Sequence, residues 1–388
     1  MTYTPLARQE AIDLMFSNFA FTPKTEIVAV QDALNRIIAH DTMAAHSLPV
    51  YRVAAMDGIA VKYADFAQGM PDTSQWQAGH DFVFADTGDD FPDEFDSVIK
   101  IENVTINPTG GLTLHETPEK GQNLKPAASS VEKGAVLVQA RTILTPRHLA
   151  VLTAGGIQNI EVVRKPKVAF IPTGTELIPA GSRPKRGQNI ETNSFMVSSM
   201  LKEWCADPLI FPTLVDSKNE IEGVLADALN ACDIVLINAG SSKGQEDFTL
   251  RVLEKTGRVF AHCLKNAPGR PITLAVVNGK PVIGVPGPPI ATDCCMRKTV
   301  RYFVYHWYGI DPIRATVRAT LTEDMTSSAE MEIFTRVIIE KNGAKYTAKS
   351  AGFGKNLAQT LSISNGLLTM PIGIDIYPKG TEVDIEID

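Results

Sequence analysis

Short apolar runs alternate with helix-like segments between residues 167 and 307. Residues 167–171, 209–214, 234–237 and 281–285 are mostly apolar, a composition typical of strands buried on both faces of a sheet. The segments between these runs place apolar residues at helical spacings. The alternation predicts a doubly wound α/β domain, in which a mostly parallel sheet lies between two layers of helices.

Small or polar residues follow three of these predicted strands, at 173–176, 239–247 and 286–289. In an open parallel sheet, ligands bind outside the carboxyl ends of the strands. The small residues of 239–247 let backbone N–H groups approach a ligand, and the helical segment after them favours an anion. We therefore expect the three loops to form one crevice. Taken singly, each loop is more often an ordinary strand–helix connection.

The rest of the chain has mainly β character. Helical spacing occurs at 6–19 and 145–154, whereas 62–140 and 311–388 contain short runs of strand type separated by turn signals. These patterns predict a multidomain α/β plus β protein with four domains. The four predicted domains are an N-terminal helical and extended domain (1–50 with 141–165), an inserted β domain (51–140), the α/β domain (166–310) and a C-terminal β-barrel or sandwich (311–388).

Charge and cysteine content exclude several classes of protein. A net charge of -7 argues against nucleic acid as a partner, because phosphate neutralisation requires a basic surface. The five cysteines are odd in number and form no C-x-x-C pair, so we expect reduced thiols. No apolar run approaches the ~20 residues of a membrane span, and no signal-peptide pattern opens the chain. We expect a cytoplasmic protein that binds neither nucleic acid nor membrane.

Ordered motifs along nearly the whole chain resemble the family of MoeA and the gephyrin E domain. They are residues 32–39 (DALNRIIA), 55–61 (AMDGIAV), 173–177 (TGTEL), Asn193, 240–247 (GSSKGQED), 268–271 (PGRP) and 286–289 (PGPP). The absence of a G-x-G-x-x-G motif at a strand–helix junction argues against a nucleotide-dependent dehydrogenase. The resemblance also implies that the central domain is similar to MogA.

The resemblance implies a transferase of molybdenum cofactor biosynthesis. Such an enzyme inserts molybdenum, or tungsten, from its oxyanion into the dithiolene of adenylylated molybdopterin and releases AMP. Magnesium is the expected cofactor, because carboxylates that hold a divalent cation stabilise the charge on phosphate oxygens. The implied assembly is an elongated homodimer with its active site between subunits. The molybdopterin adenylyltransferase and molybdoenzyme chaperones are further implied partners.

Site residues follow from the resemblance position by position. It implies catalytic roles for Asp57, Glu176 and Asp247, and metal binding by Glu176, Asp216 and Asp247. The implied cofactor-binding residues are Thr87, Glu102, Thr173, Gly174, Asn193, Gly240, Ser241, Ser242, Lys243, Gly244, Pro286, Gly287 and Arg336. Read without the resemblance, each carboxylate is more often a solvated surface acid.

Several positions depart from the family pattern. Cys263 and Ala267 stand where two lysines are usual, and Pro288 and Ala291 replace an asparagine and a serine. Lys243 could supply a replacement cation, although a solvated lysine is an equally good reading. The substitutions leave a second hypothesis open: a paralogue that binds molybdopterin or the finished cofactor as a carrier, chaperone or scaffold.

Overall fold

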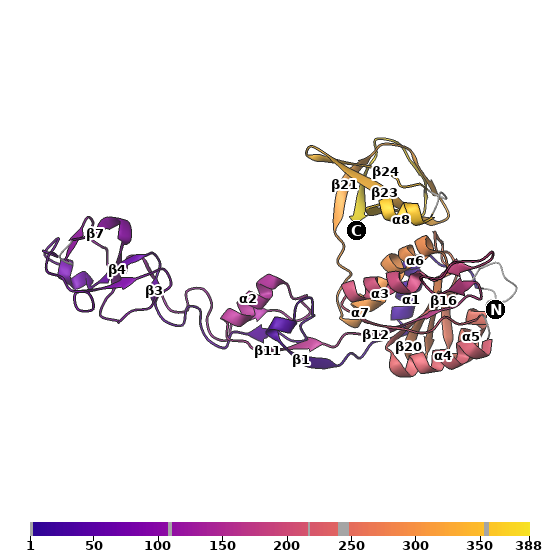
Figure 1. Cartoon of the computed structure of the whole chain (residues 1–388), viewed down its shortest axis with the longest axis horizontal. Coiled ribbons are helices and arrows are strands. Elements are labelled where there is room, and N and C mark those ends of the chain that lie inside the picture. The colour runs from indigo at the N-terminus through magenta and orange to yellow at the C-terminus, as the bar shows by residue number, and fades with distance from the viewer. Residues whose placement is uncertain (1–2, 108–110, 216–217, 240–247, 353–356) are drawn as a thin grey trace. The chain divides into compact units, whose positions relative to one another are not determined.

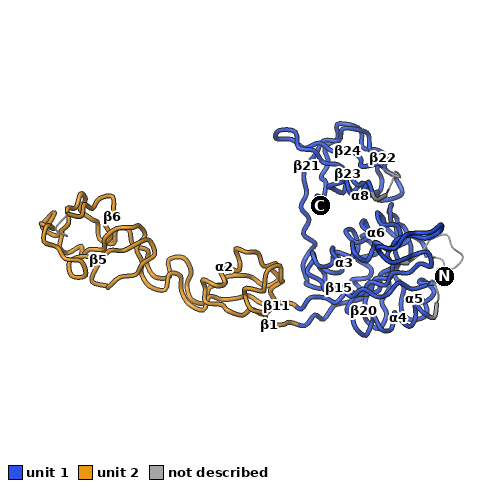
Figure 2. The backbone as a smooth tube through the Cα atoms, in the orientation of Figure 1, with its two compact units in different colours: residues 1–24, 164–388 blue, residues 25–163 orange. Residues whose placement is uncertain are grey.

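The chain forms two compact units. A computed structural model describes residues 3–107, 111–215, 218–239, 248–352 and 357–388. One unit comprises residues Thr25–Val163, and the other combines Met1–Lys24 with Arg164–Asp388 (Figure 2). The first unit is therefore an insertion between two parts of the second, and each unit is described by itself below. The predicted four-domain boundaries remain a prediction.

The unit Thr25–Val163 contains two β-rich regions. In the first, β1 (Thr25–Ala29) pairs with β11 (Asn159–Val163), β2 (Thr42–Met43) pairs with β10 (Val136–Val138), and α2 (Pro146–Ala154) packs beside them. In the second, β4 (Gly58–Val61) is the centre of a sheet with β5 (Phe82–Ala85) and β6 (Ser97–Lys100). Two small ribbons complete it: β3 (Val53–Ala54) with β9 (Leu124–Lys125), and β7 (Val104–Ile106) with β8 (Leu112–Leu114).

Gly58 is required at the start of β4 because the neighbouring strand passes very close. A Cβ atom on Gly58 would lie 1.9 Å from the carbonyl oxygen of Ile99 on β6. No side chain fits in that space. The glycine of the Asp57-Gly58 pair therefore serves the packing of the strands, and not only the turn that the sequence indicates.

The second unit is built on a six-stranded sheet in the order β15-β12-β16-β20-β19-β17. The strands are β12 (Lys167–Pro172), β15 (Asp207–Ile210), β16 (Ile234–Ala239), β17 (Arg258–His262), β19 (Thr273–Val277) and β20 (Lys280–Pro286). β15, β12, β16 and β20 are parallel, as predicted, whereas β19 and β17 continue the sheet in antiparallel fashion. The mostly parallel sheet is confirmed.

Helices cover both faces of this sheet (Figure 1). The helices α4 (Lys218–Ala231) and α5 (Phe248–Thr256) form one layer and share a core with the sheet. On the other face, α1 (Arg8–Phe16) contacts β17 and β19. On the same face, α3 (Asn193–Glu203) contacts β12, and α6 (Pro289–Cys295) contacts β20. α6 runs on through a π-helical turn (Met296–Val300) into α7 (Arg301–Trp307). The helix expected after residue 289 therefore forms with one irregular turn.

The last part of the chain is a closed barrel. Its elements are β21 (Thr316–Leu321), β22 (Met325–Ser328), β23 (Glu332–Asn342), β24 (Lys345–Ser350), α8 (Leu357–Ile363), β25 (Gly366–Met370), β26 (Ile374–Tyr377) and β27 (Glu382–Ile387). The order β23-β24-β21-β27-β25 closes because β25 also pairs with β23. β18 (Asn266–Ala267) joins β23 from the α/β part. Of the two β architectures expected here, the barrel is the one formed.

The helices of the described residues are too short or too polar to cross a membrane.

Candidate functional site

The carboxyl ends of three adjacent parallel strands bring two of the predicted loops together. Pro172 at the end of β12 pairs with Asn238, and Ala239 at the end of β16 pairs with Pro286 on β20. The loops after β12 and β20 therefore leave the same edge of the sheet. Residues 240–247 follow the strand between them, but they lie outside the described residues, as does Asp216. Gly240, Ser241, Ser242, Lys243, Gly244 and Asp247 thus remain sequence predictions.

Asn238, a buried residue of β16, connects the residues at this edge. Its side-chain amide donates to the carbonyl oxygens of Val285 (3.2 Å) and Pro286 (2.7 Å). Its Oδ1 accepts a hydrogen bond from Asn193 Nδ2 at 2.9 Å, and its carbonyl oxygen accepts one from Thr173 Oγ1 at 2.8 Å. The residue fixes three loops against one another. The sequence analysis missed it, although an asparagine inside an apolar strand is the signal that could have revealed it.

Asn193 begins helix α3 and reaches across to the loop after β20. Besides Asn238, its Nδ2 donates to the carbonyl oxygen of Gly287 at 2.8 Å. Its own Oδ1 is buried and accepts no hydrogen bond within the described structure. The predicted residues Thr173, Asn193, Pro286 and Gly287 are therefore in one hydrogen-bonded group.

Glu176 is the metal-binding candidate that the described residues contain. Its side chain is exposed, and a Cβ atom on Gly174 would lie 2.9 and 3.0 Å from its two carboxylate oxygens. Gly174 has φ +152°, so it adopts a conformation that suits glycine alone. Within the described ranges, no three His, Cys, Asp or Glu residues are grouped as metal ligands would be. The two other proposed ligands, Asp216 and Asp247, fall outside those ranges.

In the unit Thr25–Val163, Asp57, Thr87 and Glu102 lie at one end of the β5-β4-β6 sheet. Asp57 Oδ1 accepts hydrogen bonds from the Thr87 hydroxyl (2.7 Å) and the Thr87 backbone amide (2.6 Å). These two donors lower the pKa of the Asp57 carboxyl, because both stabilise its charged form. The amide of Ile101, next to Glu102, donates to the Asp57 carbonyl oxygen. The structure thus brings together three residues that extend over 45 positions of the sequence, from Asp57 to Glu102.

A cavity of about 440 Å³ lies between the α/β part and the barrel of the second unit. Residues 267–271 form one wall together with Pro286, Pro288, Ile290 and Ala291, and the β23 residues from Phe334 to Arg336 form part of the other. The walls are mostly apolar. Ala267, Pro288 and Ala291, three of the positions that depart from the family pattern, line this cavity. Three of the four substitutions named above are therefore gathered in one place, and Cys263 is the exception.

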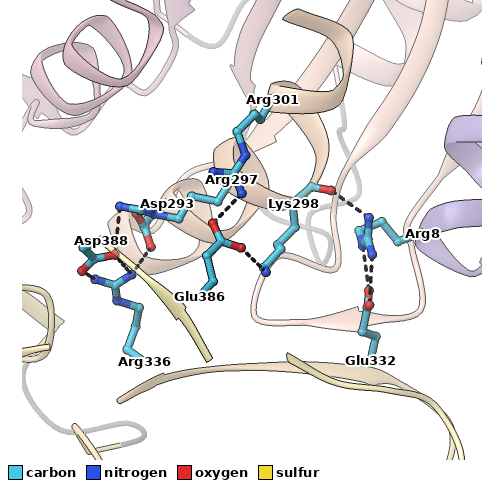
Figure 3. A network of polar contacts seen from close by, with 9 residues as sticks. All are labelled: Arg8, Asp293, Arg297, Lys298, Arg301, Glu332, Arg336, Glu386 and Asp388. Atoms are coloured by element: carbon cyan, nitrogen blue, oxygen red, sulfur yellow. Dashed lines mark hydrogen bonds and ion pairs between the residues drawn. The ribbon is translucent and has the colours of Figure 1, made fainter. Parts of the chain in front are cut away.

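Arg336 lines the cavity but is fully engaged by other side chains. Its Nε donates to Ser364 Oγ at 3.0 Å, and its two terminal nitrogens form a bidentate pair with the Asp388 carboxylate. Figure 3 shows this pair as part of a larger network that joins the barrel to α6 and its continuation. The guanidinium is 5% exposed. Arg336 is thus a buried, charge-neutralised wall residue.

Three family models match the chain in succession. They are the MoeA N-terminal region (domains I and II) over residues 6–156, a probable molybdopterin binding domain over 169–306, and the MoeA C-terminal region (domain IV) over 318–387. A molybdopterin molybdenumtransferase of Haemophilus influenzae is 32% identical over 298 residues, which are 74% of each chain. The chain belongs to the MoeA family.

Other MoeA relatives extend over the full length. A molybdopterin molybdenumtransferase of Bacillus subtilis is 27% identical and covers 98% of this chain and 94% of its own. The solved structure of a molybdopterin biosynthesis MoeA protein from Pyrococcus horikoshii OT3 matches with a TM-score of 0.81 at 26% identity, covering 99% of this chain and all of that one. The expected family and the expected α/β plus β architecture are both confirmed.

Proposed function

We propose that this chain is a transferase of molybdenum cofactor biosynthesis, which inserts molybdenum from molybdate into adenylylated molybdopterin and releases AMP. The observation that carries this proposal is the 32% identity with a molybdopterin molybdenumtransferase over 74% of the chain. The hydrogen-bonded group around Asn238 supports it, because its loops end at the edge of the sheet where such folds bind ligands.

The residues at this edge have complementary tasks in the proposed reaction. Thr173, Gly174, Asn193, Pro286 and Gly287 would hold the molybdopterin phosphate, with the loop 240–247 adding backbone N–H donors beside them. The side chain of Asn193 is held in one orientation, because its amide donates to two acceptors. The Oδ1 of Asn193, which accepts no hydrogen bond from the described residues, is a candidate acceptor for a ligand N–H or O–H group.

Magnesium fits Glu176, the proposed metal ligand that lies within the described residues. Mg²⁺ keeps several waters and is usually held by one or two carboxylates together with substrate phosphates. Glu176 offers an exposed carboxylate, which is suited to such a partly hydrated ion. When bound, the ion would neutralise charge on the phosphate oxygens. Glu176, Asp216 and Asp247 would hold it.

Asp57 is proposed to act in catalysis, with Thr87 and Glu102 beside it in binding. The two hydrogen bonds from Thr87 keep the Asp57 carboxyl ionised, so it is prepared to orient a donor or to balance a positive charge. We also propose a cytoplasmic homodimer with an active site between subunits. The molybdopterin adenylyltransferase and molybdoenzyme chaperones are the proposed partners.

One assay separates the enzyme from a carrier. The purified protein is incubated with adenylylated molybdopterin, magnesium and molybdate, and AMP is quantified. We expect release of AMP that depends on molybdate and is lost in Asp247→Ala while the dimer persists. Tight binding of the nucleotide without such release would favour a carrier, a reading that the names of the relatives do not specifically support.

A further inference from the structure

A basic segment of the α/β part lies between two groups of candidate site residues. It runs from β13 (Leu177–Ile178) to β14 (Asn189–Ile190), and these two short strands pair with each other. We call residues 177–190 the basic arm, because they include Arg183, Lys185 and Arg186 and no acidic residue. This concentration of positive charge is notable in a chain whose net charge is -7.

Hydrogen bonds attach both ends of the basic arm to the candidate site. The backbone amide of Asn189 donates to the carbonyl oxygen of Glu176, the proposed metal ligand, at 2.9 Å. Glu191 follows the arm, and its carboxylate accepts a hydrogen bond from the amide of Ser194 at 3.0 Å, in the first turn of the helix that Asn193 begins. The arm therefore leaves the site beside Glu176 and returns to it just before Asn193.

The three cations of the arm are available to an approaching molecule. Arg183, Lys185 and Arg186 are exposed, and the described residues offer their side chains neither a hydrogen bond nor an ion pair. The carboxylates nearest in sequence are Glu176, which is exposed, and Glu191, which is buried. With both carboxylates included, residues 173–193 still carry more positive than negative charges.

The position of these cations matters because the proposed metal ligands are all acidic. Glu176, Asp216 and Asp247 repel a negatively charged molecule that approaches before the metal ion has bound. The phosphoanhydride of adenylylated molybdopterin makes this substrate such a molecule. Exposed cations beside a site of this kind raise the local concentration of the anion and the rate at which it associates.

We propose that the basic arm attracts the anionic pterin nucleotide from solution to the carboxyl edge of the sheet. Arg183, Lys185 and Arg186 act at long range and determine how fast the substrate arrives, whereas the chemical step belongs to other residues. The inference rests on the proposed function for the identity of the substrate. It requires a strong dependence on ionic strength, because the Debye length falls from about 10 Å at 0.1 M salt to about 3 Å at 1 M.

The test measures the association rate of the substrate with the full-length protein. Stopped-flow mixing follows tryptophan fluorescence while adenylylated molybdopterin binds in the absence of molybdate. In the triple variant Arg183→Gln, Lys185→Gln, Arg186→Gln we expect association to be about tenfold slower at about 0.02 M salt. The rates of the variant and of the unsubstituted protein should converge as the salt concentration approaches about 1 M.

A matched control removes the same charge from another surface. Lys341, Lys345 and Lys379 are exposed residues of the barrel. Their combined replacement by glutamine should leave the association rate within about twofold of that of the unsubstituted protein. If the arm variant is unstable by thermal unfolding, the three single substitutions replace it, and each should slow association by about twofold.

Equal association rates of the arm variant and the unsubstituted protein at low salt overturn the proposal. Equal slowing in the barrel control also overturns it, because the effect would then belong to the net charge of the whole protein. In the AMP assay, the arm variant should lower kcat/KM for the nucleotide more than it lowers kcat. The expected slowing in a protein that releases no AMP contradicts only the proposed function, whereas a protein that does not bind the nucleotide contradicts both.

Discussion

At the residue scale, Asn238 shows how one polar side chain organises the candidate site. It contributes to four hydrogen bonds that join β16 to Thr173 after β12, to the first residue of α3 and to the end of β20, in a position that is 2% exposed. Substitution by alanine would leave the amide of Asn193 with one acceptor fewer and would remove a donor from the carbonyl groups of Val285 and Pro286, although Pro286 keeps the hydroxyl of Thr292.

We therefore expect Asn238→Ala to lower the free energy of unfolding by about 2 kcal/mol or more. Chemical denaturation followed by circular dichroism measures this difference. Asn230→Ala is the control, because Asn230 is exposed near the end of α4 and alanine suits a helix. Equal stability of both variants would show that the hydrogen bonds around Asn238 contribute nothing net.

A second residue-scale prediction concerns Asp57. Thr87→Val removes the hydroxyl donor but keeps the amide, so the pKa of Asp57 should rise toward its ordinary value without reaching it. Because the folded pKa is lowered, the stability that this contact adds is present above the unfolded pKa and is lost as pH falls through the folded one. Carboxyl-detected NMR titration measures the change.

Asp81 provides the internal control for that titration. Its pKa is lowered chiefly by the backbone amide of Gln77 and then by the His80 side chain, neither of which the substitution affects. A shift of Asp81 equal to that of Asp57 would point to a general change in the fold and would argue against a local hydrogen bond.

At the element scale, the helix α6–α7 is joined to the last strand by buried charges. Glu386 on β27 accepts a hydrogen bond from Lys298 at 2.7 Å and pairs with Arg301, and all three side chains are buried. Burial alone would raise the pKa of Glu386, but the two cations beside it lower the pKa below its ordinary value. The barrel is thereby attached to the helix through charge pairs as well as apolar contacts.

Glu386→Leu should destabilise the protein by about 3–5 kcal/mol, because it leaves two buried cations without their partner. Glu382→Leu on the same strand is the control, since Glu382 is exposed. Thermal unfolding compares the two variants. The stability that Glu386 contributes is complete above its unfolded pKa and declines as pH falls through its lowered folded pKa. The unfolding temperatures of Glu386→Leu and of the unsubstituted protein should therefore converge in acid.

The elements differ in how well the sequence predicts them. β12, β16 and β20 are recognisable because strands buried on both faces must be apolar throughout. The antiparallel pair β17–β19 is not predicted from the sequence, because its pairing depends on neighbours that are distant in the chain. Alternating apolar residues predict the strands of 311–388 but leave a barrel and a sandwich equally open, because the decisive pairing of β23 with β25 is also non-local.

The same limit applies to the candidate site. The loops that contain Thr173, Pro286 and Gly287 are visible as small or polar residues after a strand, whereas Asn193 could be named only through the resemblance to the family. The partners of Arg336 could not, because Asp388 reaches it only through the fold of the barrel.

At the scale of the whole molecule, the unit Thr25–Val163 is attached through two neighbouring connections. Thr25 is paired with Val163, and the amide of Arg164 donates to the carbonyl oxygen of Lys24 at 2.9 Å. The unit has its own apolar cores, which include Ile38, Leu144 and Val162 in one region and Ile59, Phe82 and Ile99 in the other.

We expect a fragment of residues 25–163 to fold alone. Its amide NMR spectrum should be dispersed, and its Asp57 should keep the lowered pKa. A fragment that ends at residue 140 is the matched comparison: it lacks α2 and β11, so the core around Leu144 and Val162 cannot form. If the amide NMR spectra of both fragments are narrowly dispersed, as for unfolded chains, the unit depends on the rest of the protein for folding.

The bond between Lys24 and Arg164 has a consequence for protein engineering. The two ends of the excursion are already adjacent in the second unit, so a turn of a few residues could replace all 139 residues from 25 to 163. The shortened chain would carry the sheet edge, the cavity and the Asp388 contact without the Asp57 group. Mixing it with the separate fragment would then reveal whether the two pieces complement each other in trans.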